Sequence, residues 1–88
     1  MSRRLRIQPG VVEWREFEEE VVAVDTRKAV YMAVNRSGSI LWPALLEGAT
    51  REELIGRLVE SYGIDGTDAA QDVDAFVGAL DDQELLER

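Results

Sequence analysis

The sequence predicts an α+β fold, in which a three-stranded antiparallel sheet is followed by three helices. Residues 11–34 hold three short runs of β-branched and aromatic residues separated by polar connections, which is typical of a β-meander. From residue 35 onward, apolar residues recur at helical spacing between N-cap residues and glycines, which is typical of short amphipathic helices. A chain of 88 residues forms one domain of this kind, with a thin core.

Residues 1–10 are expected to form a flexible N-terminal arm. Three of its first six residues are arginines, and Gln8-Pro9-Gly10 is a turn signal that separates the arm from the first strand. The folded domain is therefore expected to cover residues 11–88.

The first strand is expected over residues 11–15. Apolar Val12 and Trp14 alternate there with charged Glu13 and Arg15, the period-2 pattern of a strand with one buried face. The apolar side of this strand should therefore face the core.

The second strand is expected over residues 21–24, a continuous apolar run that suits the middle of the sheet. Phe17 falls out of phase with the buried face of the first strand, and the charge run at 18–20 predicts a solvated hairpin connection. The second connection covers residues 25–28, where Asp25 is well suited to open a turn by bonding its own backbone.

The third strand is expected over residues 29–34 and is the last strand before the helices. In a meander such a strand lies at an edge of the sheet, where some of its N–H and C=O groups are unpaired. An edge of this kind can accept a peptide as an added strand. The stretch is therefore a candidate peptide-binding element.

The first helix is expected to begin at Asn35, with Ser37 and Ser39 as rival N-caps, and to end at Gly48. Pro43 sits badly in this helix, because proline has no N–H to donate and crowds the preceding turn. The sequence leaves two alternatives open: the helix starts late, or it bends at the proline.

The second helix has a strong start, because Thr50 and Glu53 have the spacing of a capping box. Gly63 is expected to end it. The third helix begins near Asp65 or Thr67, both good N-caps. Its apolar stripe is formed by Ala69, Ala70, Val73, Phe76, Val77 and Leu80, and Leu85-Leu86 are expected to fold back on the core.

Composition excludes much chemistry, because the chain has no cysteine and no histidine. Zinc and copper sites, cysteine nucleophiles and serine–histidine relays all need these side chains. Asp65-Gly66-Thr67-Asp68 fails the spacing of a calcium loop, and no glycine-rich phosphate loop is present. The sequence therefore predicts no metal site, no cofactor and no enzyme activity.

The charge is divided unevenly along the chain. Residues 1–36 hold seven Lys/Arg and six Asp/Glu, whereas residues 37–88 hold three and twelve. The helical half would therefore repel phosphates, which argues against a nucleic-acid partner. No apolar run approaches the roughly 18 residues needed to cross a bilayer, so we expect no membrane partner and a cytoplasmic location.

The order of elements and four strings of residues resemble the PqqD-like proteins, also called RiPP recognition elements. These are small winged helix-turn-helix domains that bind the leader peptides of ribosomally made, later modified peptides. The resemblance covers nearly everything from Val11 to Leu86. It rests on AVYMAVN at 29–35 running into SGSILW at 37–42, on LEGATREEL at 46–54 and on DVDAFVGAL at 72–80.

The resemblance implies a winged helix-turn-helix-like fold and a non-catalytic function. A stand-alone domain of this family, as in lasso peptide pathways, binds the leader of a precursor peptide and presents the precursor to a leader peptidase or another modifying enzyme. In the family the leader pairs as an added antiparallel strand with the third strand and lies against the last helix. Carried onto this chain, the implied peptide-binding residues are Ala29, Val30, Tyr31, Met32, Ala33, Ala69, Asp72, Val73 and Phe76.

Alternatives remain at this stage. Val73 and Phe76 have the alternative explanation that they are ordinary core residues. A DNA-binding winged-helix regulator is the main rival function, but residues 58–87 hold no Lys or Arg to face a groove. An acid–base catalyst built on Asp81 and Asp82 is the enzymatic rival. Adjacent residues on a helix point apart, however, so these two carboxylates are better explained as a solvated helix end.

Overall fold

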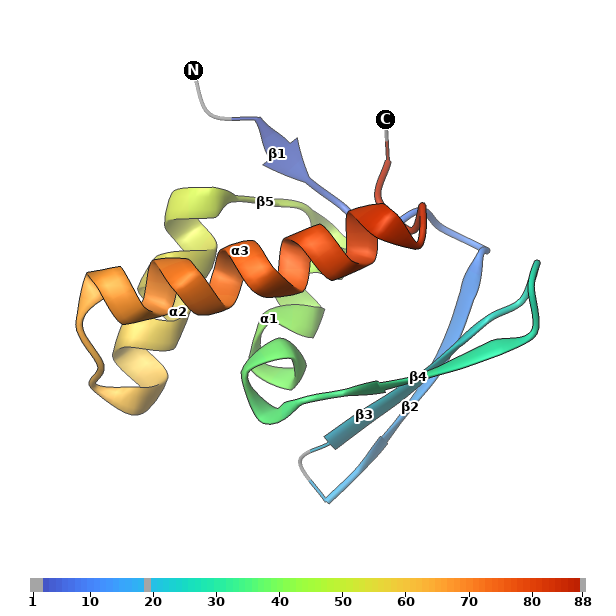
Figure 1. Ribbon diagram of the computed structural model, residues 1–88, viewed down its shortest axis with the longest axis horizontal. Helices are drawn as coiled ribbons and strands as arrows, with labels where there is room; N and C mark the ends of the chain where they lie inside the picture. Colours follow the sequence, from blue (N-terminus) through green and yellow to red (C-terminus); the bar gives the residue numbers. More distant parts are fainter. Residues whose placement is uncertain (1–2, 19, 88) are drawn as a thin grey trace.

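The computed structural model describes residues 3–18 and 20–87. Figure 1 shows a sheet on one side of the molecule and the helices on the other, with α3 lying across α1 and α2. The α+β class with a three-stranded antiparallel sheet ahead of the helices is confirmed. The elements are β1 (Arg4–Leu5), β2 (Val12–Phe17), β3 (Glu20–Asp25), β4 (Val30–Val34), α1 (Arg36–Glu47), β5 (Ala49–Thr50), α2 (Arg51–Tyr62) and α3 (Gly66–Asp82).

The sheet has the order β2-β3-β4, so β3 is the middle strand and β4 is an edge, as the sequence indicates. All pairs are antiparallel, and the register places Asp25 opposite both Val12 and Val30. The first strand runs further than expected, to Phe17. Residue 19 of the expected connection at 18–20 lies outside the described residues. So do residues 1 and 2 of the expected arm and residue 88 of the expected domain.

One face of the sheet packs on the helices, and we call it the inner face. Val21 and Ala23 of β3 are buried there, and Trp14 of β2 meets Trp42 of α1 edge to face at a centroid distance of 6.1 Å. Alternation then turns Glu13 to the opposite face, which we call the outer face. The expected phase of the first strand is therefore confirmed.

The start of α1 decides between the alternatives at Pro43. The Asn35 side chain accepts a hydrogen bond from Gly38 N at 2.7 Å, which identifies Asn35 as the N-cap. The rival Ser39 has another role, because its Oγ accepts from Val21 N of β3 at 3.1 Å. The late start is therefore wrong, and the helix continues through Pro43.

The other helices begin and end at the expected signals. Thr50 and Glu53 form a capping box at α2, and Gly63 ends that helix in the left-handed conformation at φ 65°. Asp65 caps α3 by accepting from Asp68 N at 3.0 Å. Two bonds from the Arg51 guanidinium to the Asp74 carboxylate, at 2.7 and 2.9 Å, join α2 to α3.

The N-terminal segment is bound to the domain, which differs from the loosely held arm expected over residues 1–10. β1 pairs with β5, and Ile7 is 3% exposed in the core. Ile7 N donates to Leu45 O at 2.9 Å, and Gln8 N donates to Leu85 O at 2.7 Å. The physical reason is that Ile7 fills the core between α1 and the segment after α3.

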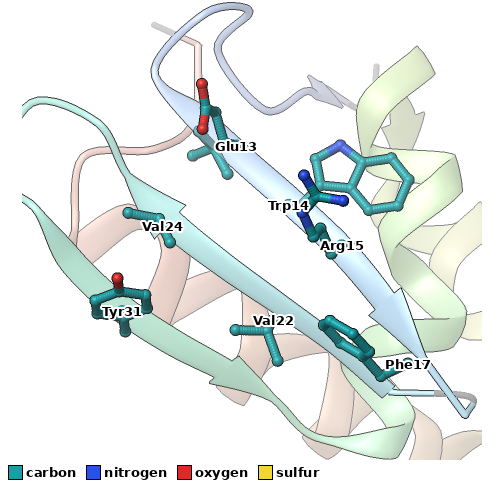
Figure 2. A pocket seen from close by; sticks show the side chains of 8 residues that line it. Glu13, Trp14, Arg15, Phe17, Val22, Val24 and Tyr31 are labelled. Atoms are coloured by element: carbon teal, nitrogen blue, oxygen red, sulfur yellow. The ribbon is translucent and has the colours of Figure 1, made fainter.

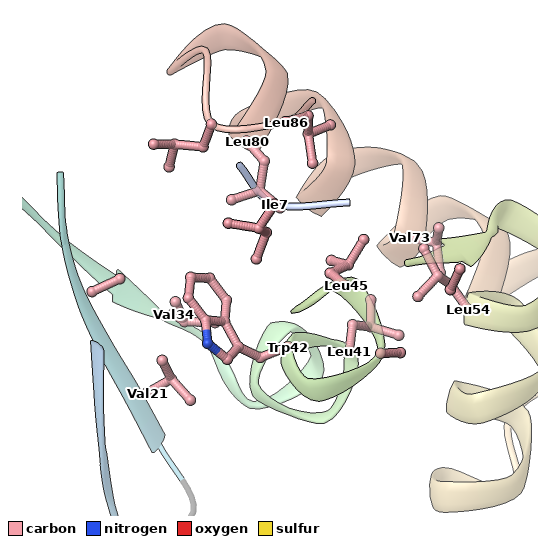
Figure 3. Close-up of a cluster of buried hydrophobic side chains, with 14 of the residues drawn as sticks. Ile7, Val21, Val34, Leu41, Trp42, Leu45, Leu54, Val73, Leu80 and Leu86 are labelled. Carbon is pink, nitrogen blue, oxygen red and sulfur yellow. The ribbon is translucent and has the colours of Figure 1, made fainter. Parts of the chain in front are cut away.

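The core forms one cluster that joins the sheet, all three helices and both ends of the described chain. Figure 3 shows Trp42 among Val21, Val34 and Ile7, so side chains distant in sequence meet on this one residue. Leu85 and Leu86 are buried, which confirms that this segment folds back. The largest fully buried side chains are Trp42, Leu41, Leu45, Leu54, Leu58, Leu80, Leu85 and Val73.

Ile7→Ala tests whether the N-terminal segment belongs to the core. The change should lower the free energy of unfolding by about 2–5 kcal/mol, because it leaves a cavity among packed side chains. Val30→Ala is the control, and it should cost less than about 1 kcal/mol because Val30 is exposed. Urea denaturation measures both. Equal, small losses would mean that the segment is held loosely.

Candidate functional site

The direction of the backbone groups in β4 follows from one hydrogen bond. Thr26 N donates to Val11 O at 3.0 Å, so the in-plane polar groups of Thr26 point toward the β2 side. Along an antiparallel strand these groups alternate in direction from one residue to the next. The polar groups of Asp25, Ala23 and Val21 therefore point toward β4.

Those three residues lie opposite Val30, Met32 and Val34 in the register. Polar groups of opposed residues of this kind face each other, so the three β4 residues pair with β3. At the end of the ladder Val21 N donates to Ser39 Oγ at 3.1 Å. Tyr31 and Ala33 then direct their N–H and C=O groups to the open side of β4. The edge thus offers two residues, each with one donor and one acceptor, to an added strand.

A groove runs beside this edge between β4 and α3. Its larger part has a volume of about 240 Å³ and its smaller part about 80 Å³. Met32 lines both parts, so the two adjoin at this residue. The larger part is lined by Met32, Ala33, Val34, Asn35, Ser37, Asp72, Ala75, Phe76 and Ala79, and the smaller part by Asp25, Val30, Tyr31, Met32, Gln83 and Leu85.

Phe76 is the large aromatic side chain in this groove, and it is half-buried. Its position depends on Gly38 of α1, which lies directly beneath it. A Cβ atom at position 38 would lie 2.6 Å from Phe76 Cε1 and 2.7 Å from Val34 Cγ1. Glycine therefore allows α1 to approach both side chains closely, and the Phe76 ring remains at the floor of the groove.

The β3–β4 turn is attached to the end of α3. Arg27 donates to both carboxylate oxygens of Asp25 at 3.3 Å and to Glu84 O at 3.1 Å, and Lys28 Nζ donates to Gln83 O at 3.4 Å. Cations are favoured beside carbonyls at a helix C-terminus. The turn therefore fixes the spacing between β4 and α3 at this end of the groove.

Asp25 accepts three kinds of donor in this turn and is 5% exposed. Its Oδ1 accepts from Arg27 N at 2.9 Å and from Lys28 N at 3.3 Å, which confirms the expected bond of Asp25 to its own turn. The hydrogen bond from the Arg27 side chain lowers the pKa of this carboxyl below its ordinary value. Asp25 is therefore ionised at neutral pH.

Asp72 gives the larger part of the groove a negative charge. It is exposed on α3 and is the one ionisable side chain among the described residues that line this part. Because residues 58–87 hold no Lys or Arg, no cation of α3 offsets it. The groove therefore favours a cationic or neutral ligand over an anionic one.

Most of the residues that the resemblance implies lie together. Val30, Tyr31, Met32 and Ala33 form the body of β4, whereas Ala29 lies just before the strand with a positive φ of 54°. From α3, Asp72 and Phe76 line the larger part of the groove.

Ala69 and Val73 require a correction, because both are 0% exposed in the core. Their side chains offer no surface to a bound peptide. The physical reason is the rotation of α3 about its axis. Its buried stripe carries Ala69, Val73 and Leu80. The stripe that faces the groove carries the residues one position earlier, such as Asp72 and Ala79. For Val73, the core alternative is therefore the correct one.

Eight groove residues are not among those that the resemblance implies: Asp25, Val34, Asn35, Ser37, Ala75, Ala79, Gln83 and Leu85. On α3, Ala75 and Ala79 follow Asp72 at i+3 and i+7, and Phe76 follows it at i+4, so all four lie on one face of the helix. That spacing could have identified them, but small side chains give a weak hydrophobic pattern. Asn35 and Ser37 lie at the end of β4 and the start of α1, where their capping roles mask any other role.

The described part of the chain has no cluster of three or more acidic side chains that could hold a metal ion. None of its helices is long and apolar enough to span a membrane. The chemistry that the site does offer is backbone hydrogen bonding along β4 and a mixed apolar and polar groove beside it. An extended polypeptide satisfies both.

Comparison with known proteins gives a family and two solved structures. The model of the family described as coenzyme PQQ synthesis protein D (PqqD) matches residues 20–86. The TbiB1 protein in complex with the TbiA(β) leader peptide is 29% identical, with 93% of this chain and 94% of that chain covered and a TM-score of 0.82. Comparison with curated proteins finds no match.

The second structure is a lasso peptide synthetase B1 complexed with the leader peptide. It is 22% identical and covers 98% of this chain and 100% of that chain, with a TM-score of 0.81. At this identity the likeness concerns the fold, which is the winged-helix-like arrangement of a three-stranded sheet and helices. Since the family model matches more than half of the residues, the chain belongs to the PqqD family.

Proposed function

We propose that this protein is a non-catalytic leader-peptide-binding protein, which holds a ribosomally synthesised precursor and presents it to a separate enzyme. The observation that carries the proposal is the open edge of β4 beside the α3 groove. Membership of the PqqD family and the likeness to TbiB1, whose structure contains a leader peptide, support it. The enzyme served is a leader peptidase or another modifying enzyme, which we call the processing enzyme.

In this mechanism the leader adds to β4 as an antiparallel strand. Leader residues opposite Tyr31 and Ala33 exchange hydrogen bonds with them, which gives affinity independent of leader sequence. The leader residue opposite Met32 turns its side chain to the inner face, where Phe76 and Ala79 line the groove. Side chains that enter the groove therefore supply the specificity.

The protein increases processing by raising the local concentration of the precursor at the processing enzyme. This mechanism needs no cofactor and no metal. We place it in the cytoplasm, because ribosomally made precursors are synthesised there.

The DNA-binding alternative is disfavoured by the charge of α3. Asp68, Asp72 and Asp74 are exposed on this helix, and a recognition helix that enters the major groove must approach phosphates. The acidic helix is compatible instead with a leader that carries basic residues.

Proline substitution along β4 tests the added strand. Tyr31→Pro and Ala33→Pro remove donors that face the open edge, so each domain should stay folded while leader affinity falls at least about tenfold. Val30→Pro and Met32→Pro remove donors to β3 and should each cost about 1–3 kcal/mol of stability or more. Circular dichroism melts and calorimetric titration with a leader peptide measure both effects. Equal destabilisation by all four changes would refute the model of strand addition.

Phe76→Ala tests the groove. Loss of an aromatic anchor should weaken leader binding by about 2 kcal/mol or more. The stability loss should be smaller than the roughly 3–5 kcal/mol of a fully buried phenylalanine. Leu80→Ala, a buried position on the same helix, is the matched control and should mainly lower stability. If Phe76→Ala kept full affinity and lost stability as Leu80→Ala does, Phe76 would be a core residue only.

Ionic strength tests the charge of the groove. A leader with Lys or Arg near its bound segment should associate more slowly as salt rises from about 10 mM to about 1 M, because the screening length falls from about 30 to about 3 Å. Asp72→Asn should reduce this salt dependence more than Glu60→Gln, which removes an exposed charge from α2. Stopped-flow fluorescence gives the rates. If the association rate did not change with salt, the negative charge of the groove would play no part in leader binding.

A further inference from the structure

The outer face of the sheet exposes a group of apolar and aromatic side chains. Val22 and Val24 of the middle strand point to this face, and Phe17 and Tyr31 flank them with 57% and 77% of their surfaces exposed. Figure 2 shows these side chains together on one face. With Glu13 and Arg15 they line a shallow hollow of about 750 Å³.

This composition departs from an ordinary solvated sheet face. Antiparallel sheets with one exposed face usually carry polar residues on it, because alternation separates apolar from polar positions. Here β3 carries valines on both faces, with Val21 buried on the inner face and Val22 on the outer. No element among the described residues covers the outer face. Exposed apolar side chains gathered in this way make the outer face a candidate interaction site.

The outer face is continuous with the proposed leader site through Tyr31. The Tyr31 backbone groups face the open edge, while its side chain is part of the outer face. A leader strand added to β4 would place alternate side chains on the outer face beside Tyr31. The bound leader therefore extends this surface, and a partner on it would contact protein and peptide together.

Three occupants can be compared on physical grounds. The leader itself does not suit the face, because the backbone hydrogen-bonding groups of a sheet lie at its edges. A second copy would bring together two chains of net charge −8, which repel each other. A folded partner with an apolar patch avoids both difficulties, and charged groups at its rim can pair with Arg15 and Glu13.

Access to the bound leader identifies the partner. The inner side of β4 faces α3, and the leader itself would occupy the edge. The outer face is the side from which a folded protein can reach the peptide. We propose that the processing enzyme docks on the outer face, with Phe17, Val22 and Val24 as its apolar contact and Arg15 at its rim. This inference rests on the proposed function.

The test separates docking from leader binding with variants outside the leader site. Phe17→Ser and Arg15→Glu change the outer face, and Arg57→Glu is the charge-matched control on an exposed position of α2. The probes are a leader peptide, for affinity, and the purified processing enzyme, acting on the full precursor. Melting curves verify that each variant is folded.

Both outer-face variants should bind the leader within about twofold of the wild-type affinity. The concentration of this protein needed for half-maximal processing should rise about tenfold or more, as loss of a contact worth about 1.4 kcal/mol predicts. Arg57→Glu should behave as the wild type in both assays.

Two results would overturn the inference alone. One is wild-type processing by folded Phe17→Ser and Arg15→Glu proteins that bind the leader normally. The other is a wild-type dimer in sedimentation velocity that Phe17→Ser dissociates, which would assign the face to a second copy. Failure of the wild-type protein to bind any leader would instead refute the proposed function, and the inference with it.

Discussion

The register of the β3–β4 hairpin is the constraint on which the rest of the site depends. With Asp25 opposite Val30, the alternation of backbone groups leaves Tyr31 and Ala33 unpaired at the edge. A slip of one residue would exchange the paired and unpaired positions and would turn Met32 from the groove to the outer face. The bonds of Arg27 to Asp25 and to Glu84 O hold the turn in place and so stabilise this register.

Three surfaces follow from that register. The edge of β4 carries sequence-independent hydrogen bonding, and the inner side carries the groove in which Phe76 lies over Gly38. The outer face carries the exposed aromatic side chains of Phe17 and Tyr31 and the half-buried side chains of Val22 and Val24. In the account proposed here the edge provides affinity for the leader, the groove provides specificity, and the outer face provides contact with the processing enzyme.

Local rules of sequence predicted the elements well. The caps at Asn35, Thr50 and Asp65 act through side-chain bonds within three residues, so sequence alone reveals them. The short pairing of β1 with β5 and the burial of Ile7 depend on contacts more than 35 residues apart, which no local pattern reports. The rotation of α3, which buries Ala69 and Val73, is likewise set by tertiary packing.

Amide hydrogen exchange measured by NMR tests the central claim most directly. In the free protein, the N–H groups of Tyr31 and Ala33 should exchange fast, and those of Met32 and Val34 slowly, because only the latter pair with β3. Addition of a leader peptide should slow exchange selectively at Tyr31 and Ala33. Protection of Tyr31 and Ala33 in the free protein, or no change on saturation with a bound leader, would contradict the account.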